Sequence, residues 1–391
     1  MDLAAPAKDD VLQLLRPARA RVDLDRLAAN YHALRALVPV PVMPVVKADA
    51  YGHGAAAVAR RLVAEGVDRL AVAYVEEAVA LRENGFSLPI VVLAAFGPGQ
   101  ERMVRKHHLT PVVSTPRTLE AVLGPARESR RPLPVHLKVD TGMSRLGFTT
   151  EAFVEAAERL ASAKGIALEG VMTHLASADE DRDVTERQLD RFDEAVAALH
   201  RRGIRPAYVH ACNSAGLAVF RPTHTLVRPG LLLYGIRPRP LSPDVEVRPV
   251  MTVSADIALV KDVPAGTPVS YGGRWVAPRP SRIATLPLGY ADGVPRTDGM
   301  RERGAFVVKG RRAPVRGTVC MDLTMVDVTD GPAVTERDEA VFLGDEPDAW
   351  EVAERAGTNA WEVLTRIGPR VPRVYVEGGR VTGVQSPFVR A

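Results

Sequence analysis

The sequence has 391 residues, of which 46% are hydrophobic and 25% charged, the composition of an ordinary soluble globular protein. This length suggests about two or three domains and is ample for large hydrophobic cores. The formal net charge of +4 comes from Lys and Arg scattered among Asp and Glu, with no basic block interleaved with aromatic residues, so nucleic acid is not an expected partner.

The cysteines and the N-terminus argue against further classes. Cys212 and Cys320 form neither a CxxC pair nor a Cys/His cluster with metal-ligand spacing, so we expect no structural zinc or other metal. The first ten residues contain no apolar segment behind a basic start, and no run reaches the roughly 18 apolar residues of a membrane helix. We therefore expect a cytoplasmic protein without a membrane span.

The chain begins with a polar segment rich in Pro and Ala, and we expect residues 1–18 to form a loosely held arm. Residues 19–24 alternate like a short strand. Helical spacing follows over residues 25–34, where Asp23 or Asp25 is placed to cap the helix.

From residue 41 the chain repeats a unit of short apolar strand, small-residue turn and amphipathic helix. The expected strands are 42–46, 69–73, 90–93, 110–113, 134–139, 168–172, 208–210 and 225–227. The expected helices are 54–65, 76–84, 98–107, 118–130, 151–164 and 184–202. About eight such units predict an α/β fold with a (β/α)8 TIM-type barrel, which we assign to residues 19–242. A doubly wound sheet is the alternative, but it usually has fewer strands and a Gly-rich fingerprint after the first.

After Gly235 the helical periodicity fades and β-branched alternation replaces it. The expected strands are 251–260, 267–271, 282–287, 305–308, 318–328 and 339–343, and one helical segment covers 348–356. Pro and Gly interrupt these runs about every ten residues. Residues 243–391 are therefore predicted to form a mostly β C-terminal domain.

Polar residues recur at the ends of the predicted barrel strands, where barrel active sites lie. They are Lys47, Lys138, Asp140, His174, Asn213, Ser214 and Arg228. One polar strand end means little, but a series on one rim indicates a site.

Lys47 has two readings on its own. It is either a strand-end residue that reaches solvent or an amine in a dry pocket, where desolvation lowers its pKa and frees the lone pair to attack a carbonyl. The same rim offers a place for an anion. Ser214 and the backbone of Gly230 and Leu231 can donate to a phosphate after strands seven and eight, and Tyr51 can add a hydroxyl. A lysine facing a phosphate-bearing ligand suggests pyridoxal 5'-phosphate held as a Schiff base.

Seven motifs, in order along almost the whole chain, closely resemble those of the alanine racemase family. They are residues 45–54 (VVKADAYGHG), 138–147 (KVDTGMSRLG), 226–230 (LVRPG), 233–235 (LYG), 269–272 (VSYG), 288–293 (LGYADG) and 317–322 (GTVCMD). The resemblance implies a pyridoxal-phosphate-dependent isomerase of fold type III that interconverts L- and D-alanine and supplies D-alanine for cell-wall peptidoglycan.

The family pattern also implies how the bases are arranged. Two bases must flank a planar carbanion, and the pattern places Lys47 on the D side and Tyr271 on the L side. Tyr271 belongs to the second domain, and the family resolves this with a homodimer in which active sites are shared between subunits. A tyrosine is a poor base at neutral pH unless positive charge favours its phenolate, and the resemblance gives that role to Arg145 and His174.

The remaining roles follow from the same resemblance. Arg145 and the backbone N–H of Met321 would hold the substrate carboxylate. Arg228 would face the pyridine nitrogen, where it donates a hydrogen bond without giving up a proton. The strand ends His174 and Asn213 join Tyr51, Ser214, Gly230 and Leu231 as the expected cofactor contacts. Lys138, often carbamylated in the family, would steer Arg145.

Other residues carry weaker expectations. Cys320 suggests a nucleophile, but no His/Asn partnership accompanies it, and a buried structural cysteine is the commoner role; the same reading applies to Cys212. Asp292 and Asp322 are expected to shape the site or the dimer contact. Three further residues resemble the lining of the family's entry corridor: Asp179, Tyr290 and Arg296.

One departure from the family pattern concerns the cofactor phosphate. Many members carry a tyrosine shortly before the terminal Arg-Val-Pro-Arg, whereas here Arg370–Arg373 follows Gly368-Pro369. The phosphate contacts and the pocket shape are therefore expected to differ from those of such members.

Three alternatives remain open at this point. A racemase of serine or broader specificity is one, because binding alone separates alanine from serine by only about 1–3 kcal/mol per group. A barrel-type amino-acid decarboxylase is the second, although it would place a carboxylate where Arg228 stands. A non-catalytic pyridoxal phosphate carrier is the third, although a carrier needs neither a second base nor a β domain.

Overall fold

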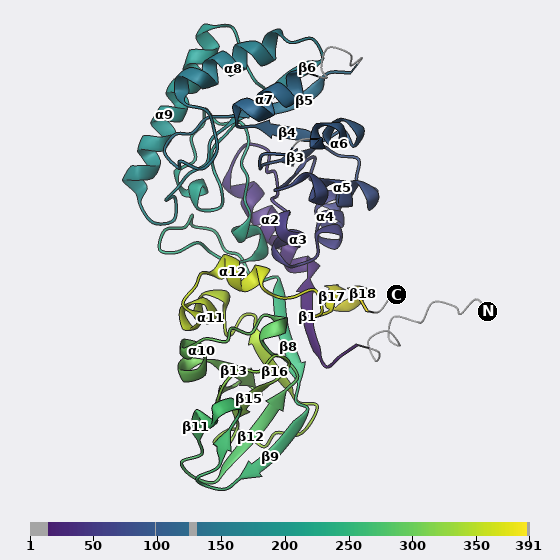
Figure 1. The fold of residues 1–391 in the computed structure, drawn as a ribbon, viewed down its shortest axis with the longest axis vertical. Helices are drawn as coiled ribbons and strands as arrows, with labels where there is room; N and C mark the ends of the chain where they lie inside the picture. Colours follow the sequence, from purple (N-terminus) through teal and green to yellow (C-terminus); the bar gives the residue numbers. More distant parts are fainter. Residues whose placement is uncertain (1–14, 98, 125–130, 389–391) are drawn as a thin grey trace, which may run out of the picture. The chain divides into compact units, whose positions relative to one another are not determined.

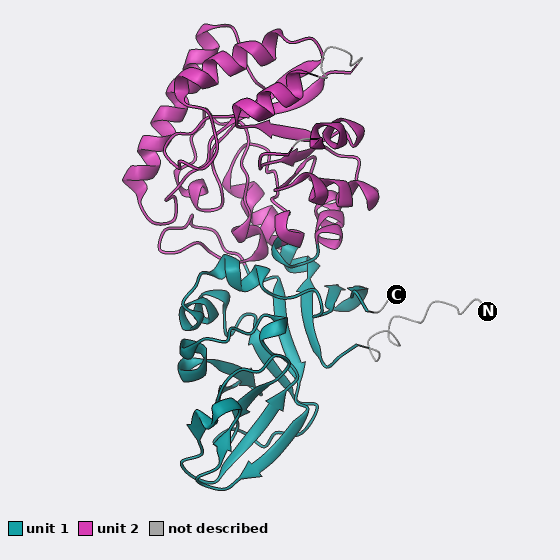
Figure 2. Cartoon of the chain, viewed as in Figure 1, with its two compact units in different colours: residues 1–27, 51–54, 248–391 teal, residues 28–50, 55–247 magenta. Residues whose placement is uncertain are grey.

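The computed structural model describes residues 15–97, 99–124 and 131–388, and these form two compact units (Figures 1 and 2). Unit 2 comprises residues 28–50 and 55–247. Unit 1 comprises the chain up to residue 27, residues 51–54 and residues 248–391. Three parts of the predictions lie outside the described residues: the start of the expected helix 98–107, the end of the expected helix 118–130, and most of the expected N-terminal arm.

Unit 2 is a barrel of parallel strands. Six strands pair in chain order: β2 (Leu70–Val72), β3 (Ile90–Val92), β4 (Thr110–Val113), β5 (Leu133–Lys138), β6 (Ile166–Met172) and β7 (Tyr208–His210). The segment around residues 42–46 joins both ends of this sheet, because Val45 bridges Ala71 and Val42 bridges Val227, each in parallel. The 225–228 segment reaches β7 through a 2.9 Å hydrogen bond from Thr225 N to Val209 O. The predicted (β/α)8 barrel is therefore confirmed.

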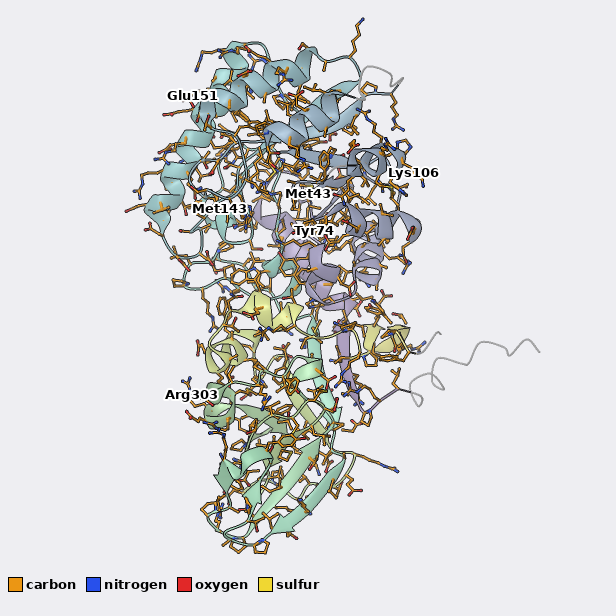
Figure 3. The ribbon with its side chains drawn as sticks, in the orientation of Figure 1. Met43, Tyr74, Lys106, Met143, Glu151 and Arg303 are labelled. Carbon is orange, nitrogen blue, oxygen red and sulfur yellow. The ribbon has the colours of Figure 1, made fainter. Side chains whose placement is uncertain are left out.

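Amphipathic helices cover the outside of the barrel. They are α2 (Leu24–Leu37), α4 (Ala55–Ala64), α5 (Val75–Glu83), α6 (Gln100–Lys106), α7 (Pro116–Leu123), α8 (Thr150–Ser162) and α9 (Arg182–Arg201). Their starts follow local capping chemistry; for example, the side chain of Asp181 accepts from Val184 N at 2.9 Å and begins α9. In Figure 3, Met43 is buried within this unit, whereas Lys106 and Glu151 lie on its exposed helices.

Unit 1 is built on a seven-stranded sheet in the order β14-β13-β16-β8-β1-β17-β18. Its strands are β1 (Ala18–Asp23), β8 (Met251–Asp256), β13 (Ala305–Val308), β14 (Arg311–Pro314), β16 (Glu339–Leu343), β17 (Arg373–Glu377) and β18 (Arg380–Gln385). The sequence grouped residues 19–24 with the barrel, but β1 pairs with β8 and β17. The physical reason lies in its alternation, because Ala18, Ala20 and Val22 are buried while the residues between them are not, whereas barrel strands are buried on both faces.

Two smaller sheets complete the β structure of unit 1: β15-β12-β9 and β10-β11. Their bounds are β9 (Leu259–Val263), β10 (Pro268–Val269), β11 (Trp275–Val276), β12 (Ser281–Leu286) and β15 (Thr324–Asp327). The expected strand 251–260 is in fact two strands in different sheets. The expected strand 318–328 begins only at Thr324, so residues 318–323 are a loop.

Three helices belong to unit 1: α10 (Asp298–Arg303), α11 (Ala349–Ala356) and α12 (Ala360–Thr365). The predicted helix 348–356 is confirmed as α11, with Asp348 as its N-cap. In the described ranges, no helix combines the length and the apolar character needed to cross a bilayer.

Candidate active site

Lys47 follows directly after the barrel segment that ends at Val46, and a left-handed turn comes next. Ala48, Asp49, Ala50 and Tyr51 have φ values of 52°, 53°, 55° and 54°. Each non-glycine residue in this region costs roughly 1–2 kcal/mol, so the turn must be held by its surroundings. Because residues 48–51 are left-handed, this part of the sequence shows neither strand nor helix periodicity. The lysine is thereby presented at the carboxyl end of the first barrel segment.

The environment of Lys47 lowers the pKa of its amine. Burial is the main cause, and the positive charge of Arg145 adds to it, while the carboxylate of Glu77 opposes both. Arg145 is exposed. A lysine with a lowered pKa has a larger fraction of free amine at neutral pH, which is what a nucleophile or a base requires.

Arg228 is a buried cation held by neutral acceptors. Its side chain donates to three backbone carbonyl oxygens, those of His210, Thr173 and Ala211, each at 2.9 Å. It also donates from Nη1 to Nδ1 of His210 at 2.6 Å. Burial lowers the pKa of Arg228 to about 10, so the guanidinium stays charged at neutral pH. Within the described part of the chain, no carboxylate is among its hydrogen-bond partners, and the barrel therefore presents a permanent donor here.

A pair of buried imidazoles extends from Arg228 into the barrel. Nε2 of His210 lies 2.8 Å from Nδ1 of His136, and Nε2 of His136 lies 3.4 Å from Oε2 of Glu169. The pKa values of both histidines are lowered, mainly by burial, so both rings are neutral. Because Arg228 can only donate, the proton of His210 lies on Nε2, and the proton of His136 must then face Glu169. This pair of histidines was not predicted from the sequence, although a histidine inside the apolar run of β5 is a signal of a buried polar contact.

Lys138 and His174 lie on the same rim. Lys138 ends β5, and burial, together with Arg145 and Arg228, lowers its pKa to about 8. Burial, reinforced by Arg228, Lys138, Arg145 and Lys47, lowers the pKa of His174 well below its ordinary value. His174 is therefore neutral in this unit, which differs from the expectation that it contributes positive charge beside the tyrosine.

The loops after β7 and after residue 228 are joined by hydrogen bonds at the position where the sequence predicts a phosphate cradle. The hydroxyl of Ser214 accepts from Gly230 N at 2.9 Å and Leu232 N at 3.2 Å, and Leu231 begins the short helix η3 (Leu231–Tyr234). Oδ1 of Asn213 accepts from Gly216 N at 2.9 Å. Pyridoxal phosphate needs an amine to bond its aldehyde and donors for its ring nitrogen and its phosphate. Lys47, with its lowered pKa, Arg228 and the hydroxyl of Ser214 beside η3 can fill these roles, so these residues fit pyridoxal phosphate.

Tyr51 closes the left-handed turn and is grouped with unit 1. It is buried, and burial raises the pKa of its phenol, so the hydroxyl keeps its proton. A protonated hydroxyl is a donor, which suits an anionic oxygen.

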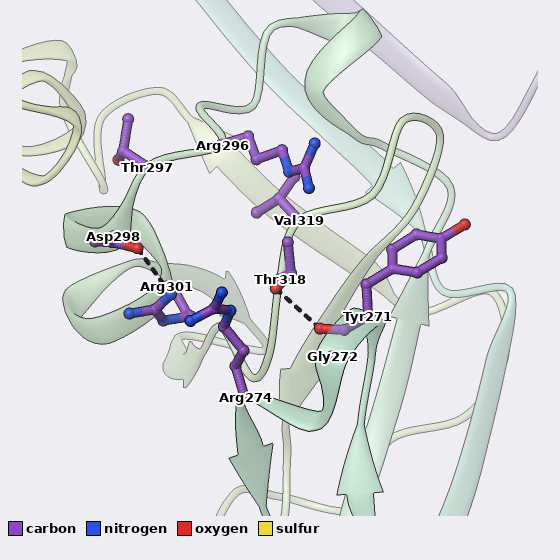
Figure 4. A pocket seen from close by; sticks show the side chains of 9 residues that line it. All are labelled: Tyr271, Gly272, Arg274, Arg296, Thr297, Asp298, Arg301, Thr318 and Val319. Atoms are coloured by element: carbon purple, nitrogen blue, oxygen red, sulfur yellow. Dashed lines mark hydrogen bonds and ion pairs between the residues drawn. The ribbon is translucent and has the colours of Figure 1, made fainter.

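Tyr271 lies in unit 1 beside a polar cavity of about 430 Å³ (Figure 4). Its side chain is 69% exposed, and its carbonyl accepts from Thr318 Oγ1 at 3.2 Å. Three arginines share the cavity lining: Arg274, Arg296 and Arg301. Asp298 pairs with Arg301 at 2.7 Å, and in Figure 4 the exposed ring of Tyr271 points away from the three arginines.

The loop 318–323 carries Cys320, Met321 and Asp322. Cys320 is a free, half-buried thiol whose Sγ lies 3.5 Å from Ser270 Oγ, next to Tyr271. Met321 is 52% exposed, and its carbonyl accepts from Ala291 N at 3.1 Å. The loop is thus anchored through its carbonyl groups.

Asp292 and Asp322 serve a structural purpose within unit 1. Arg370 donates to Asp292 at 2.7 Å and to Asp322 at 2.6 Å, and Arg16 donates to Asp292 at 2.5 Å. The positive partners outweigh the effect of burial and hold the pKa of Asp292 below its ordinary value. Both carboxylates therefore fix the segment that contains the departure Gly368-Pro369.

The other expected positions are less directly involved. The guanidinium of Arg296 lies 5.6 Å from the ring centroid of Tyr290, and the carbonyl of Asp179 accepts from Leu241 N at 2.9 Å. Cys212 is buried, and burial raises the pKa of its thiol to about 12, so it is unreactive. Within residues 15–97, 99–124 and 131–388, no group of three or more His, Cys, Asp or Glu residues is placed to hold a metal ion.

Comparison with known proteins agrees with this geometry. Residues 22–238 match the family model of the alanine racemase N-terminal domain, and residues 250–375 match that of the C-terminal domain. The alanine racemase of Halothermothrix orenii is 42% identical, covering 93% of this chain and 98% of that protein. The alanine racemase of Sorangium cellulosum is 43% identical, covering 93% and 100%.

Solved structures lead to the same family. Alanine racemase from Clostridium difficile superposes with a TM-score of 0.91 at 34% identity, covering 95% of this chain and 99% of that one. The enzyme from Streptomyces coelicolor gives 0.86 at 40% identity, covering 95% and 100%. The chain therefore belongs to the alanine racemase family of pyridoxal-phosphate-dependent isomerases.

Proposed function

We propose that the chain interconverts L- and D-alanine with Lys47 and Tyr271 as bases on opposite faces of the substrate. The observation that best supports this proposal is the environment of Arg228, a buried cation held by carbonyl groups and His210 rather than by a carboxylate. When bound, pyridoxal phosphate acidifies the α-carbon proton of an amino acid. A ring nitrogen facing Arg228 would accept a hydrogen bond without receiving a proton, which limits electron withdrawal and favours racemisation over decarboxylation.

Each base is supported by its own environment. The lowered pKa of Lys47 suits an amine that gives a proton to the α-carbon or takes one from it. Tyr271 needs nearby positive charge to act as a phenolate, and Arg145 is the proposed supplier. Arg145 and the backbone N–H of Met321 are the proposed contacts of the substrate carboxylate.

A homodimer is part of the proposal. The exposure of Tyr271 and Met321, 69% and 52%, supports a second copy that receives these residues at its own barrel mouth. The proposed division is a barrel domain within residues 24–242 and a β domain of residues 243–391 that also includes β1 (Ala18–Asp23). A cytoplasmic enzyme that provides D-alanine for peptidoglycan is the role that fits this reaction.

Lys138 is proposed to be carbamylated. A lysine with a pKa of about 8 has a larger fraction of free amine at neutral pH than an ordinary lysine, and that free amine can bond the carbon of CO2 while it releases a proton. The product would place a negative charge beside Arg145. Mass spectrometry of intact crystals should show a gain of one CO2 at Lys138, and density for a bare amine would remove the modification from the proposal.

The decisive experiment is a racemisation assay on the purified chain with added pyridoxal phosphate and a series of L-amino acids. Alanine should be converted fastest, and borohydride reduction should attach the cofactor to Lys47. Faster conversion of serine would make serine the proposed substrate. This outcome is tested because Gly368-Pro369 replaces the family's tyrosine near the cofactor phosphate. Release of carbon dioxide would instead indicate a decarboxylase.

A further inference from the structure

Glu77 connects two segments of the barrel next to Lys47. It lies in the first turn of α5 and accepts from Ala73 N at 2.7 Å and Tyr74 N at 3.1 Å through Oε2. Its other oxygen, Oε1, accepts from Ala48 N at 2.6 Å. The carboxylate thus binds the start of α5 and the residue directly after Lys47 at the same time.

The segment that Glu77 holds is strained. Left-handed geometry in a run of non-glycine residues persists only where surrounding contacts determine it. Further contacts that support the turn include the hydrogen bond from Ala50 N to Val46 O at 2.9 Å and the one from Ala55 N to Asp49 Oδ1 at 2.7 Å. Glu77 reaches the turn from another barrel unit.

Glu77 also acts on the charge of Lys47. Arg145 lowers the pKa of this lysine and Glu77 raises it, while burial remains the largest influence. His174 also lies near enough for Lys47 to lower its pKa, but its ring is neutral. Among the described residues, Glu77 is the carboxylate whose charge raises the pKa of Lys47.

We propose that Glu77 is a positioning residue for Lys47: its carboxylate holds the left-handed turn that presents the lysine and balances the charge of the amine. The catalytic consequence rests on the proposed function of Lys47, whereas the contact with Ala48 stands without it. A glutamine at this position has one carbonyl oxygen, which can serve either Ala48 or the start of α5, and its amide group would face an N–H donor at the other.

The test compares the full-length chain with Glu77→Gln and with Glu76→Gln as a matched control. Glu76 is the neighbouring residue on α5, and its carboxylate accepts from Gln100 Nε2 at 2.7 Å on the exposed side. Competitive acetylation of the cofactor-free chain, read by mass spectrometry at Lys47 across a pH series, reports the ionisation of that amine. Circular dichroism confirms that each variant is folded.

In Glu77→Gln the acetylation midpoint of Lys47 should move to lower pH, and in Glu76→Gln it should not move. Turnover of the reconstituted Glu77→Gln enzyme should fall on the order of tenfold to a hundredfold, because the amine is displaced. A purely structural cap would lower stability without moving the midpoint. An unchanged midpoint in a folded Glu77→Gln variant overturns the proposal.

Glu77→Asp covers the case in which Glu77→Gln does not fold. The aspartate keeps the charge but shortens the reach to Ala48, so the acetylation midpoint should stay near the native one while turnover falls. Native turnover in Glu77→Asp would contradict the positioning role. Borohydride trapping at a lysine other than Lys47 would refute the proposed function alone, because the acetylation result does not depend on the cofactor.

Discussion

Nη1 of Arg228 donates to Nδ1 of His210 over 2.6 Å, and this contact sets the proton positions of two buried imidazoles. His210 must accept there and donate to His136, whose remaining proton faces Glu169. The guanidinium of Arg228, which is expected opposite the pyridine ring, is therefore held by two neutral imidazoles whose hydrogen bonds all run in one direction, from Arg228 through His210 to His136.

Replacing His210 removes the acceptor of Arg228 and should show how much this hydrogen bond contributes to stability. We expect His210→Phe to lower the free energy of unfolding by about 1–3 kcal/mol, because a buried charged donor loses its partner. Urea denaturation measures this change, and the visible spectrum of the bound cofactor should shift as Arg228 moves. Glu169→Gln keeps an acceptor near His136 and should lose much less stability; an equal loss in both would contradict the ordered chain.

The stability of the protein should fall in mild acid. The pKa values of His136, His174 and His210 are lowered in the folded state, so between neutral pH and their folded values the unfolded chain binds more protons. The free energy of unfolding should therefore decrease as pH falls through roughly 6.5, the ordinary histidine pKa. Urea denaturation at a series of pH values measures the slope. The slope should be shallower in His210→Phe and unchanged when the exposed His108 is replaced by Gln.

Gly170 leaves the space that His136 occupies. A Cβ at this position would lie 2.7 Å from Nδ1 of the imidazole, closer than real contacts allow. We expect Gly170→Ala to displace the ring and to lower both the melting temperature and activity. Gly97→Ala is the matched control, because its Cβ would meet Gln100 Oε1 at an ordinary 3.6 Å. Equal melting temperatures for the two variants would show that the histidine pair can move freely.

The two-base proposal predicts an asymmetric loss on changing Tyr271. We expect Tyr271→Phe to slow exchange of the α-proton of L-alanine with solvent deuterium by about 10²–10⁴-fold, because the general base is gone. Exchange from D-alanine, which would use Lys47, should persist. NMR of each enantiomer in deuterium oxide separates the two faces. If Tyr271→Ala exchanged protons on both faces at the native rate, the β domain would need another role.

The barrel was predictable from sequence because buried parallel strands appear as continuous apolar runs with small-residue turns between them. The rim residues Lys47, Lys138, His174 and Arg228 were also visible, since strand ends mark the active face of a barrel. Glu77 and His136 were not, because a carboxylate at a helix start and a polar residue within a strand gain meaning only from their partners. β1 was misplaced because the prediction followed its position in the chain, whereas its alternation fits a sheet with one buried face.

Arg373 links residues that are far apart in the sequence. Its Nε donates to the carbonyl of Gly52 at 2.9 Å, and β17, which it begins, pairs in parallel with β1. A ribosome must therefore complete nearly the entire chain before the start of unit 1 can acquire its last neighbours. Until residues 373–377 have been synthesised, β1 lacks its parallel partner β17, and the carbonyl of Gly52 lacks the donor Arg373. A truncation that removes β17 and β18 should thus damage the first part of the chain as severely as the last.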